Sequence, residues 1–379
     1  MTPDLETSLS YCTYCPKLCR HTCPVSHAEA RETLVPQAKM AMLRLLRRGD
    51  METEADNAAV LYGCTGCLAC TTACRHGITP GKHLLTARAD MESAGAGHPA
   101  LEDLPERVRE TARRAAHAAR EALGTRPAAD RSAPSNGEAG ERANGEREAR
   151  VAFFPACDDP GLGVTALRLF ERAGVTDAGL AEVSLGCGGY PLLAGGFPVA
   201  FRLHAEVVAR ELARYERVVM ACPACVVTMR EEYPRHGVAL RPEVLHPAEF
   251  LDTLRERLPL PRAQKEDARG TAFYHDPCYL GRHSGVYEAP RRLLQAARME
   301  VREFSRNQAE GECSGGGGVL PITAPATARA VAEHRLEEVR EAGLETVVTA
   351  CGTCKRQLGQ SGVVVRDIIE ILEEATRDA

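Results

Sequence analysis

The residues most able to bind metal or do redox chemistry are sixteen cysteines. Half of them lie in two short motifs near the N-terminus. The second motif has the C-x2-C-x2-C-x3-C spacing of cluster-binding ferredoxins. Three thiolates at steps of three residues can wrap one face of a cubane, and the fourth is then directed toward another cluster. The two motifs are Cys12, Cys15, Cys19 and Cys23, followed by Cys64, Cys67, Cys70 and Cys74.

This geometry predicts two [4Fe–4S] clusters that draw ligands from both motifs. One cluster is expected on Cys64, Cys67, Cys70 and Cys23, and the other on Cys12, Cys15, Cys19 and Cys74. The first motif has three residues rather than two between Cys15 and Cys19, an insertion that a loop can absorb. Zinc also binds four thiolates, but zinc ribbons usually pair two C-x2-C knuckles, so the spacing favours iron and sulfide.

The other eight cysteines form an internal repeat. In the first set the steps between cysteines are 30, 35 and 3 residues, and in the second set 35, 38 and 3. An apolar run ends at the first cysteine of each set, a glycine-rich stretch follows the second, and a β-branched run precedes the final C-x2-C. Repeats of this kind indicate two related structural units. Their cysteines, all predicted metal ligands, are Cys157, Cys187, Cys222 and Cys225, then Cys278, Cys313, Cys351 and Cys354.

The elements that must position these cysteines follow from hydrophobic periodicity. Each repeat is expected to run strand, helix, strand, helix, strand, with helices over 163–173, 200–215 and 327–342. Strands that alternate with helices indicate a parallel sheet, and each cysteine is then expected just beyond the C-terminal end of a strand. We expect the two α/β repeats to face each other around a pseudo-twofold axis.

The N-terminal region has a different pattern, which predicts helices over 31–48 and 54–62. The expected fold class is therefore α + α/β: an α-helical ferredoxin-like domain (1–123), then two cysteine-rich α/β repeats (151–258 and 270–379). The segment 124–150 has no aromatic residues and is rich in Gly, Pro, Ala and charge, a composition typical of a disordered linker.

Composition narrows the function classes. The chain has 379 residues, a formal net charge of −5 and no Trp, which argues against nucleic acid as a partner. The N-terminal residues lack the basic and apolar regions of a signal peptide, and no stretch approaches the roughly 18 apolar residues of a membrane span. We therefore expect a cytoplasmic protein with reduced thiols, in which clustered cysteines indicate metal rather than disulfides.

Two ferredoxin motifs, a linker and two repeats of the form Cys…Cys-Gly-Gly…Cys-x2-Cys resemble the cysteine-rich (CCG-domain) iron–sulfur subunits of the heterodisulfide reductase D-type group. The iron–sulfur subunit of glycolate oxidase and the C subunit of anaerobic glycerol-3-phosphate dehydrogenase are relatives in that group. The stretch from His275 to Arg282, HDPCYLGR, is a specific match. The resemblance covers nearly the whole chain apart from the linker.

The chain departs from that family at the paired cysteines in the middle of each repeat. Gly186 and Glu312 stand where the first cysteine of each pair is expected. In heterodisulfide reductases the pair supports a noncubane cluster that performs disulfide chemistry, so its loss disfavours that chemistry here. Four thiolates per repeat can still hold a further iron–sulfur cluster or zinc, and Glu312 is a candidate oxygen ligand at the second site.

Other candidates have simpler explanations. The glycine run 315–318 lacks the Lys-Ser/Thr of a phosphate loop and is better explained as backbone that approaches a bulky cofactor. Cys222 and Cys225 could instead form a thioredoxin-like redox pair. His275 and Asp276 are expected to orient a loop or cap a helix, and the scattered histidines His76 and His83 to lie at the surface.

These observations predict a non-catalytic electron-transfer subunit with no catalytic residue of its own. No dinucleotide-binding motif follows a strand, so the organic chemistry belongs to a partner. The resemblance implies a flavoprotein dehydrogenase or an electron-transferring flavoprotein as that partner, a quinone or another carrier as acceptor, and peripheral contact with the inner face of a membrane. The alternatives are heterodisulfide-reductase-like thiol–disulfide catalysis at a C-terminal cluster and structural zinc in the C-terminal repeats.

Overall fold

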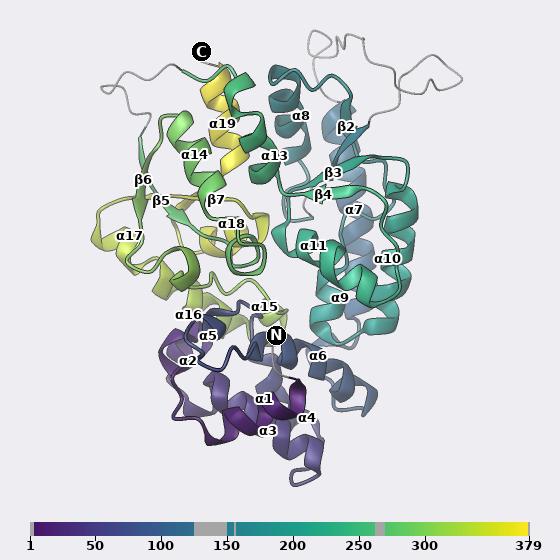
Figure 1. Ribbon diagram of the computed structural model, residues 1–379, viewed down its shortest axis with the longest axis vertical. Helices are drawn as coiled ribbons and strands as arrows, with labels where there is room; N and C mark the ends of the chain where they lie inside the picture. The colour runs from purple at the N-terminus through teal and green to yellow at the C-terminus, as the bar shows by residue number, and fades with distance from the viewer. Residues whose placement is uncertain (1–3, 125–149, 155–156, 262–269, 378–379) are drawn as a thin grey trace.

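The computed structural model describes residues 4–124, 150–154, 157–261 and 270–377. Nearly all of the predicted linker, 125–149, lies outside these ranges. Figure 1 shows a helical N-terminal region beneath two α/β units that stand side by side. The N-terminal helices are α1 (Leu5–Tyr14), α2 (Pro24–Glu29), α3 (Pro36–Arg48), α4 (Ala55–Tyr62), α5 (Ala69–Thr72), α6 (Pro80–Ser93) and α7 (Leu104–Gly124).

The first α/β unit is built on a four-stranded parallel sheet with the order β2-β1-β3-β4. Its central strand β1 is buried along its whole length, and Val151 is paired with both Ala178 and Arg217. The elements are β1 (Val151–Phe154), α8 (Leu162–Arg172), β2 (Ala178–Leu180), α9 (Tyr190–Gly195), α10 (Pro198–Leu212), β3 (Arg217–Met220), α11 (Pro223–Val227), α12 (Tyr233–Arg235), β4 (Glu243–Leu245) and α13 (Pro247–Thr253).

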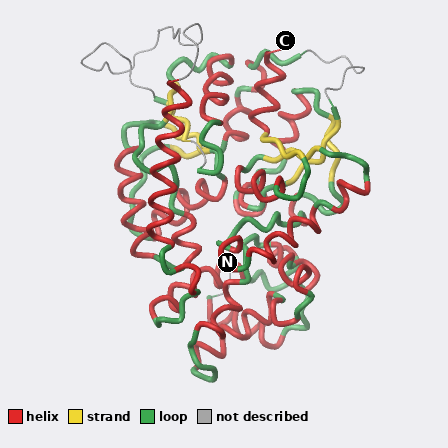
Figure 2. The backbone as a smooth tube through the Cα atoms, turned by 180° about the vertical axis from the view of Figure 1, so that it is seen from behind, coloured by secondary structure: helices red, strands yellow, loops and turns green. Residues whose placement is uncertain are grey.

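The second unit repeats this arrangement with the strand order β6-β5-β7-β8, again fully parallel. Figure 2 shows the two small sheets as separate groups of strands, each surrounded by helices. The elements are β5 (Thr271–His275), α14 (Glu288–Ala296), β6 (Glu300–Glu303), α15 (Leu320–Thr323), α16 (Pro325–Arg335), α17 (Glu337–Glu341), β7 (Thr346–Thr349), α18 (Gly352–Gly359), β8 (Val364–Asp367) and α19 (Ile368–Arg377).

The predicted helices and parallel sheets are confirmed, with local differences that have physical reasons. The first predicted helix begins at Pro36 rather than at residue 31, because proline disfavours helix at the residue before it and Val35 is extended. It ends as expected at Gly49, whose φ of 72° is left-handed. The helix predicted over 327–342 is two helices that break at Leu336. Each sheet also has a short fourth strand, β4 and β8, that periodicity did not predict.

Two packing features hold the units together. One core spans both α/β units, where α8 packs against α19 and α13 against α14. The long helix α7 packs on the first unit: Gly186 N–H donates to the carbonyl of Ala112 at 2.8 Å, and Arg120 donates to the carbonyl of Val183 at 2.9 Å. Among the helices in the described ranges, none is long and apolar enough to cross a bilayer.

Candidate iron–sulfur sites

The first N-terminal group of cysteines surrounds a small cavity. Cys12 lies near the end of α1, Cys15 and Cys19 lie in the loop after it, and Cys74 follows α5. Burial raises the pKa of the Cys12 thiol to about 12, and the neighbouring thiolates of Cys19, Cys74 and Cys15 contribute to this rise. The four sulfur atoms are therefore close enough to repel one another when ionised, as ligands of one cofactor would be before it binds.

The extra residue in the first motif is absorbed at one position. Lys17, between Cys15 and Cys19, has a φ of 65°, and its carbonyl accepts a hydrogen bond from Arg20 N–H at 3.0 Å. The left-handed residue tightens the loop, so Cys19 returns to the same cavity as Cys12 and Cys15. In the second motif Leu68 has a φ of 59° and serves a similar turn before Cys70.

The second N-terminal group lines its own cavity, made of Cys23, Cys64, Cys67 and Cys70. Burial and then the thiolates of Cys67, Cys64 and Cys23 raise the pKa of the Cys70 thiol well above its usual value. The Lys39 ammonium lies 3.7 Å from the sulfur of Cys23 and donates to the carbonyl of Gly63 at 2.5 Å. A buried cation at this place favours ionised thiolates.

Arg88 on α6 fixes the loop that carries the second group. Its guanidinium is fully buried and makes five hydrogen bonds to the carbonyls of Leu61, Cys64, Ala194 and Gly318. These acceptors belong to the N-terminal region and to both α/β units. One side chain therefore joins all three parts at the cysteine loop, a role that has no local sequence signature.

All eight C-terminal cysteines line one cavity of about 310 Å³ between the two α/β units. Cys157, Cys222, Cys278 and Cys351 follow strands directly, as predicted. Cys225 and Cys354 lie within the helices α11 and α18, and Cys187 and Cys313 lie on loops several residues beyond β2 and β6. The expectation that every cysteine sits at a strand end is therefore wrong for these four. The two sets face each other, because Cys222 and Cys351 are close enough for the charge of one to raise the pKa of the other.

Within the first set the thiols contact one another directly. Hydrogen bonds from Cys157 and Cys225 lower the pKa of the Cys187 thiol, whereas the pKa of Cys157 is raised by the same contact and by burial. In the second set a hydrogen bond with Cys278, together with burial, raises the pKa of Cys313 to about 12. The thiols of the first set are thus linked through Cys187 and Cys225, whereas those of the second set form two pairs, Cys278 with Cys313 and Cys351 with Cys354.

Backbone N–H groups point at sulfur in every group of four. The donors lie 3.4 Å from sulfur at Gly66 (to Cys64), Ile78 (to Cys74), Gly188 (to Cys225), Gly189 (to Cys187) and Gly315 (to Cys313). Donors of this kind stabilise thiolate and tune a bound cluster. The donor set therefore fits iron–sulfur ligation at each group.

The second N-terminal group meets the second α/β unit where Cys67 packs in one buried cluster with Cys278 and Cys313, and the nearby Cys313 thiol raises the pKa of Cys67 well above its usual value. Arg282 lies at this contact and donates to the carbonyl of Cys67 at 2.5 Å, while His283 contacts the carbonyl of Gly66 at 2.9 Å. Burial alone would lower the pKa of Arg282, but the nearby thiolates of Cys67, Cys278 and Cys313 outweigh it and raise the pKa. The guanidinium thus lies between two cysteine groups.

The glycine run borders the C-terminal cysteine cavity at Gly316 and Gly317, and it also has a packing role that was not predicted. A Cβ at Gly317 or Gly318 would collide with backbone atoms of Thr65 and Cys64. The run therefore lets the second α/β unit approach the cysteine loop of the N-terminal region. The contact is protein against protein, and sequence alone could not identify it because the two loops are far apart in the chain.

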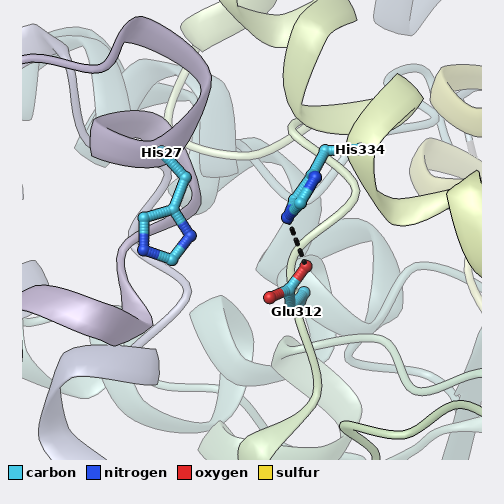
Figure 3. A group of neighbouring side chains, drawn as sticks. All are labelled: His27, Glu312 and His334. Carbon is cyan, nitrogen blue, oxygen red and sulfur yellow. Dashed lines mark ion pairs between the residues drawn. The ribbon is translucent and has the colours of Figure 1, made fainter.

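Glu312 points away from the cavity, so the expectation that it ligates at the second site is wrong. Its carboxylate is 2.9 Å from Arg306 and 3.7 Å from His334, and His27 completes the group (Figure 3). At Gly186, the corresponding position of the first unit, a Cβ would lie 2.9 Å from the backbone nitrogen of Ala116 on α7. Neither position faces the cysteines.

His275 and Asp276 orient their surroundings, as predicted. Asp276 forms a two-pronged ion pair with Arg291 at 2.8 and 2.9 Å and accepts from Gln308 N–H at 2.8 Å. His275 is fully buried, and its Nδ1 lies 3.4 Å from Nε of Arg335. The expectation of a surface position is right for His76, which is exposed, but not for His83. His83 is half-buried beside Ser8, and His76 stacks on Tyr11 at 4.7 Å beside the first cavity.

Comparison with known families agrees with this arrangement. Residues 8–78 match the 4Fe-4S dicluster domain, and residues 272–359 match the cysteine-rich domain named CCG. This is an iron–sulfur protein with a dicluster domain and a CCG domain. The resemblance to cysteine-rich iron–sulfur subunits is thereby confirmed, while the first α/β unit falls outside both matched segments.

Three relatives illustrate the similarity. The D subunit of the dihydromethanophenazine:CoB–CoM heterodisulfide reductase of Methanosarcina barkeri is 31% identical over 61% of this chain and 60% of its own length. The B subunit of the fumarate reductase (CoM/CoB) of Methanothermobacter marburgensis is 27% identical over 87% of this chain and 65% of its own. The EtfAB:quinone oxidoreductase of Syntrophomonas wolfei is 28% identical over 56% of this chain and 32% of its own length. The chain therefore spans less than two thirds of the length of these relatives.

Proposed function

We propose that this chain is an electron-transfer subunit of an oxidoreductase complex, with two [4Fe–4S] clusters in its N-terminal domain. The proposed ligands are Cys12, Cys15, Cys19 and Cys74 for the outer cluster and Cys23, Cys64, Cys67 and Cys70 for the inner cluster. Support comes from the two separate cavities that these groups line and from the thiol neighbours of Cys12 and Cys70. When bound, such clusters accept and release single electrons.

We further propose that the C-terminal cysteines hold iron–sulfur cofactors, with one group of four in each unit. The ligands would be Cys157, Cys187, Cys222 and Cys225 in 151–258, and Cys278, Cys313, Cys351 and Cys354 in 270–379. The matching strand orders support a pseudo-twofold relation between these units. The proposed domain division is that of the sequence: 1–123, a linker over 124–150, and the two repeats.

The observation that carries the proposal is the packing of Cys67 in one buried cluster with Cys278 and Cys313. Ligands of two neighbouring sites lie side by side there, so the N-terminal pair and the second repeat form one continuous series. Cys222 and Cys351 continue it into the first repeat. The proposed order of sites is therefore outer, inner, second repeat, first repeat.

Arg282 has a specific part in this series. Within the part of the chain that the structure describes, its Nη2 is buried and makes no hydrogen bond, while Nε and Nη1 hold the carbonyls of Cys67 and Gly311. A fixed positive charge with a free donor between two anionic sites stabilises added electrons on both sides. It would raise the reduction potentials of the inner site and of the second-repeat site together.

A flavoprotein partner is proposed for the outer end. Tyr14 is 80% exposed, and Tyr11 and Leu18 are about half exposed beside the outer cysteine group. Exposed apolar side chains of this kind suit a transient contact with another protein. An electron-transferring flavoprotein is the proposed donor by analogy with the relative from S. wolfei, and a quinone or another carrier is the proposed acceptor. The proposed location is cytoplasmic, with peripheral contact at the membrane.

Iron, sulfide and zinc analysis of anaerobically purified protein tests this proposal. Two N-terminal clusters require about eight iron atoms per chain, and occupied repeats require more. EPR after reduction with an electron-transferring flavoprotein should then show two interacting [4Fe–4S] signals. Zinc in place of iron at the C-terminal cysteines would support the structural-zinc alternative, and fewer than about eight iron atoms would refute the two-cluster proposal.

A second candidate, thiol–disulfide chemistry, is favoured by the C-terminal cavity. Its volume of about 310 Å³ is at the lower end of small-molecule sites, and it is lined mainly by apolar side chains and cysteines. Reduction of a disulfide there would consume two electrons from the series and two protons and release two thiols. A new paramagnetic signal on adding a thiol to oxidised protein would support this activity, and an unchanged spectrum would refute it.

A further inference from the structure

The group formed by His27, Glu312 and His334 joins the N-terminal region to the second α/β unit. His27 lies on α2, directly after the Cys23 loop, and His334 lies on α16. Glu312 lies beside Cys313. One ligand atom from each residue lies within 4.8 Å of the other two, and Figure 3 shows the His27 ring turned toward the other two side chains.

Each of the two ligands from the second unit is held by a neighbour on its far side. His334 Nδ1 is 3.1 Å from the carboxylate of Glu337, which leaves Nε2 facing Glu312. Arg306 donates to Oε1 of Glu312 at 2.9 Å, which leaves Oε2 facing His334 at 3.7 Å. Metal-bound histidines typically donate their other N–H to a carboxylate, and ligating carboxylates are themselves hydrogen-bonded.

The packing of α2 on α16 fixes the third ligand. Thr327 of α16 donates to the carboxylate of Glu29 on α2, and the His27 and His334 rings lie 6.3 Å apart, edge to face. His27 is exposed and His334 is about half exposed, so water can complete the coordination of an ion. Two imidazoles and one carboxylate with an open position are a donor set that suits zinc.

We propose that His27, His334 and Glu312 form a zinc site that fastens the N-terminal domain to the second repeat. The site uses only nitrogen and oxygen ligands, so it differs from the cysteine sites in chemistry as well as place. It does not depend on the electron-transfer proposal. The site also assigns a ligand role to Glu312, which stands where a paired cysteine was expected.

The test uses the full chain with its iron–sulfur sites filled, after removal of loosely bound metal, titrated with zinc sulfate. Wild type should bind one further zinc, whose X-ray absorption shows nitrogen and oxygen at about 2.0–2.1 Å and no sulfur shell. His27→Ala and His334→Ala should each abolish this binding. Glu337→Gln should weaken it about 10–100-fold, because it removes the partner of His334.

The matched control is His117→Ala, which removes an exposed histidine that also faces a carboxylate, Glu121, but for which the described residues offer no third ligand. It should bind zinc as wild type does, and all variants should keep the wild-type iron content. No binding by wild type, or a sulfur shell at about 2.3 Å, would overturn the proposal. Equal binding by wild type and the His27 and His334 variants would mean an adventitious ion only.

Discussion

The two α/β units have the same strand order and the same number of cysteines, but different neighbours. The second unit meets the N-terminal cysteine loop through Gly317, Gly318, Arg282 and Cys313. The first unit contacts the N-terminal region through α7 and through Arg88, which donates to the carbonyl of Ala194. Two units with the same strand order and a repeated cysteine pattern therefore differ in which of them lies against the N-terminal cysteines, and packing sets that difference.

The two units also differ in how they pack the position where the expected paired cysteine is missing. Gly186 is accommodated by close approach of the α7 backbone, and Glu312 is drawn outward by Arg306 and His334. A single change in the repeat motif has therefore been accommodated in two unrelated ways.

The largest expected effect comes from removing a ligand of the inner site. Cys70→Ala should lower the iron content by about four atoms per chain, because one [4Fe–4S] cluster cannot be held. Metal analysis and EPR measure the loss. The matched change in the first unit, Cys225→Ala, should leave the N-terminal EPR signals intact, and an unchanged iron content in Cys70→Ala would contradict the assignment.

A smaller effect, on stability, is expected where the glycine run of the second unit packs against the N-terminal cysteine loop. Gly317→Ala should destabilise the protein by about 1–3 kcal/mol, because the added Cβ collides with the carbonyl of Thr65. Thermal or denaturant unfolding measures this change. Gly359→Ala, in the same unit but with open space around it, is the control and should have little effect. Equal stability of the two variants would show that the contact is not tight.

Arg282→Gln should lower the reduction potentials of the inner site and of the second-repeat site, each by roughly 60 mV, a tenfold change for a one-electron couple. The cause is loss of the charge that lies between them. Redox titration followed by EPR measures both shifts. Arg356→Gln, at a side chain that is 53% exposed and lines the C-terminal cysteine cavity, should give a smaller shift. A shift at only one of the two sites would break the proposed coupling.

The two units also differ at equivalent helix starts, and this difference predicts opposite responses to pH. His246 precedes α13 and Asp367 precedes α19, and each is fastened to a glutamate three residues later. Burial lowers the pKa of His246 to about 3 and raises the pKa of Asp367 to about 7. Stability from His246 is therefore lost as pH falls below about 6.5, whereas stability from Asp367 is lost as pH rises through about 7.

When the pH falls from 7.5 to 5.5, wild type should lose about 1.4 kcal/mol of unfolding free energy because of His246. The His246→Asn variant should not show this loss. Asn keeps the cap to Ala248 N–H. Over the same pH range, wild type should gain about 2 kcal/mol of unfolding free energy at Asp367, and Asp367→Asn should not show this gain. Denaturant unfolding at both pH values measures the two differences, and changes of the same sign in both variants would contradict the burial argument.

Much of the fold could be predicted from local patterns. The helix over 36–48, the parallel sheets and the grouping of the N-terminal cysteines follow from periodicity, glycine and proline positions and ligand spacing. The edge strands β4 and β8 could not be predicted, because they are only partly buried and lack the apolar run that marks β1 and β3.

The remaining features depend on contacts between distant segments. The direction of Glu312 is set by Arg306 and His334, and the role of Arg88 by carbonyls from three parts of the chain. The contact between Cys67 and Cys313 has no local signature either. Such features arise from tertiary packing, which a single sequence does not display.

The most direct test of the proposed series is freeze-quench EPR during reduction of the protein by a flavoprotein, with wild type compared with Cys313→Ser and Cys187→Ser. Cys313→Ser should slow reduction of the first repeat, because the second repeat precedes it in the proposed series. Cys187→Ser should leave reduction of the second repeat at the wild-type rate. Unchanged reduction of the first repeat in Cys313→Ser, or no redox-active iron beyond the N-terminal pair, would contradict the account.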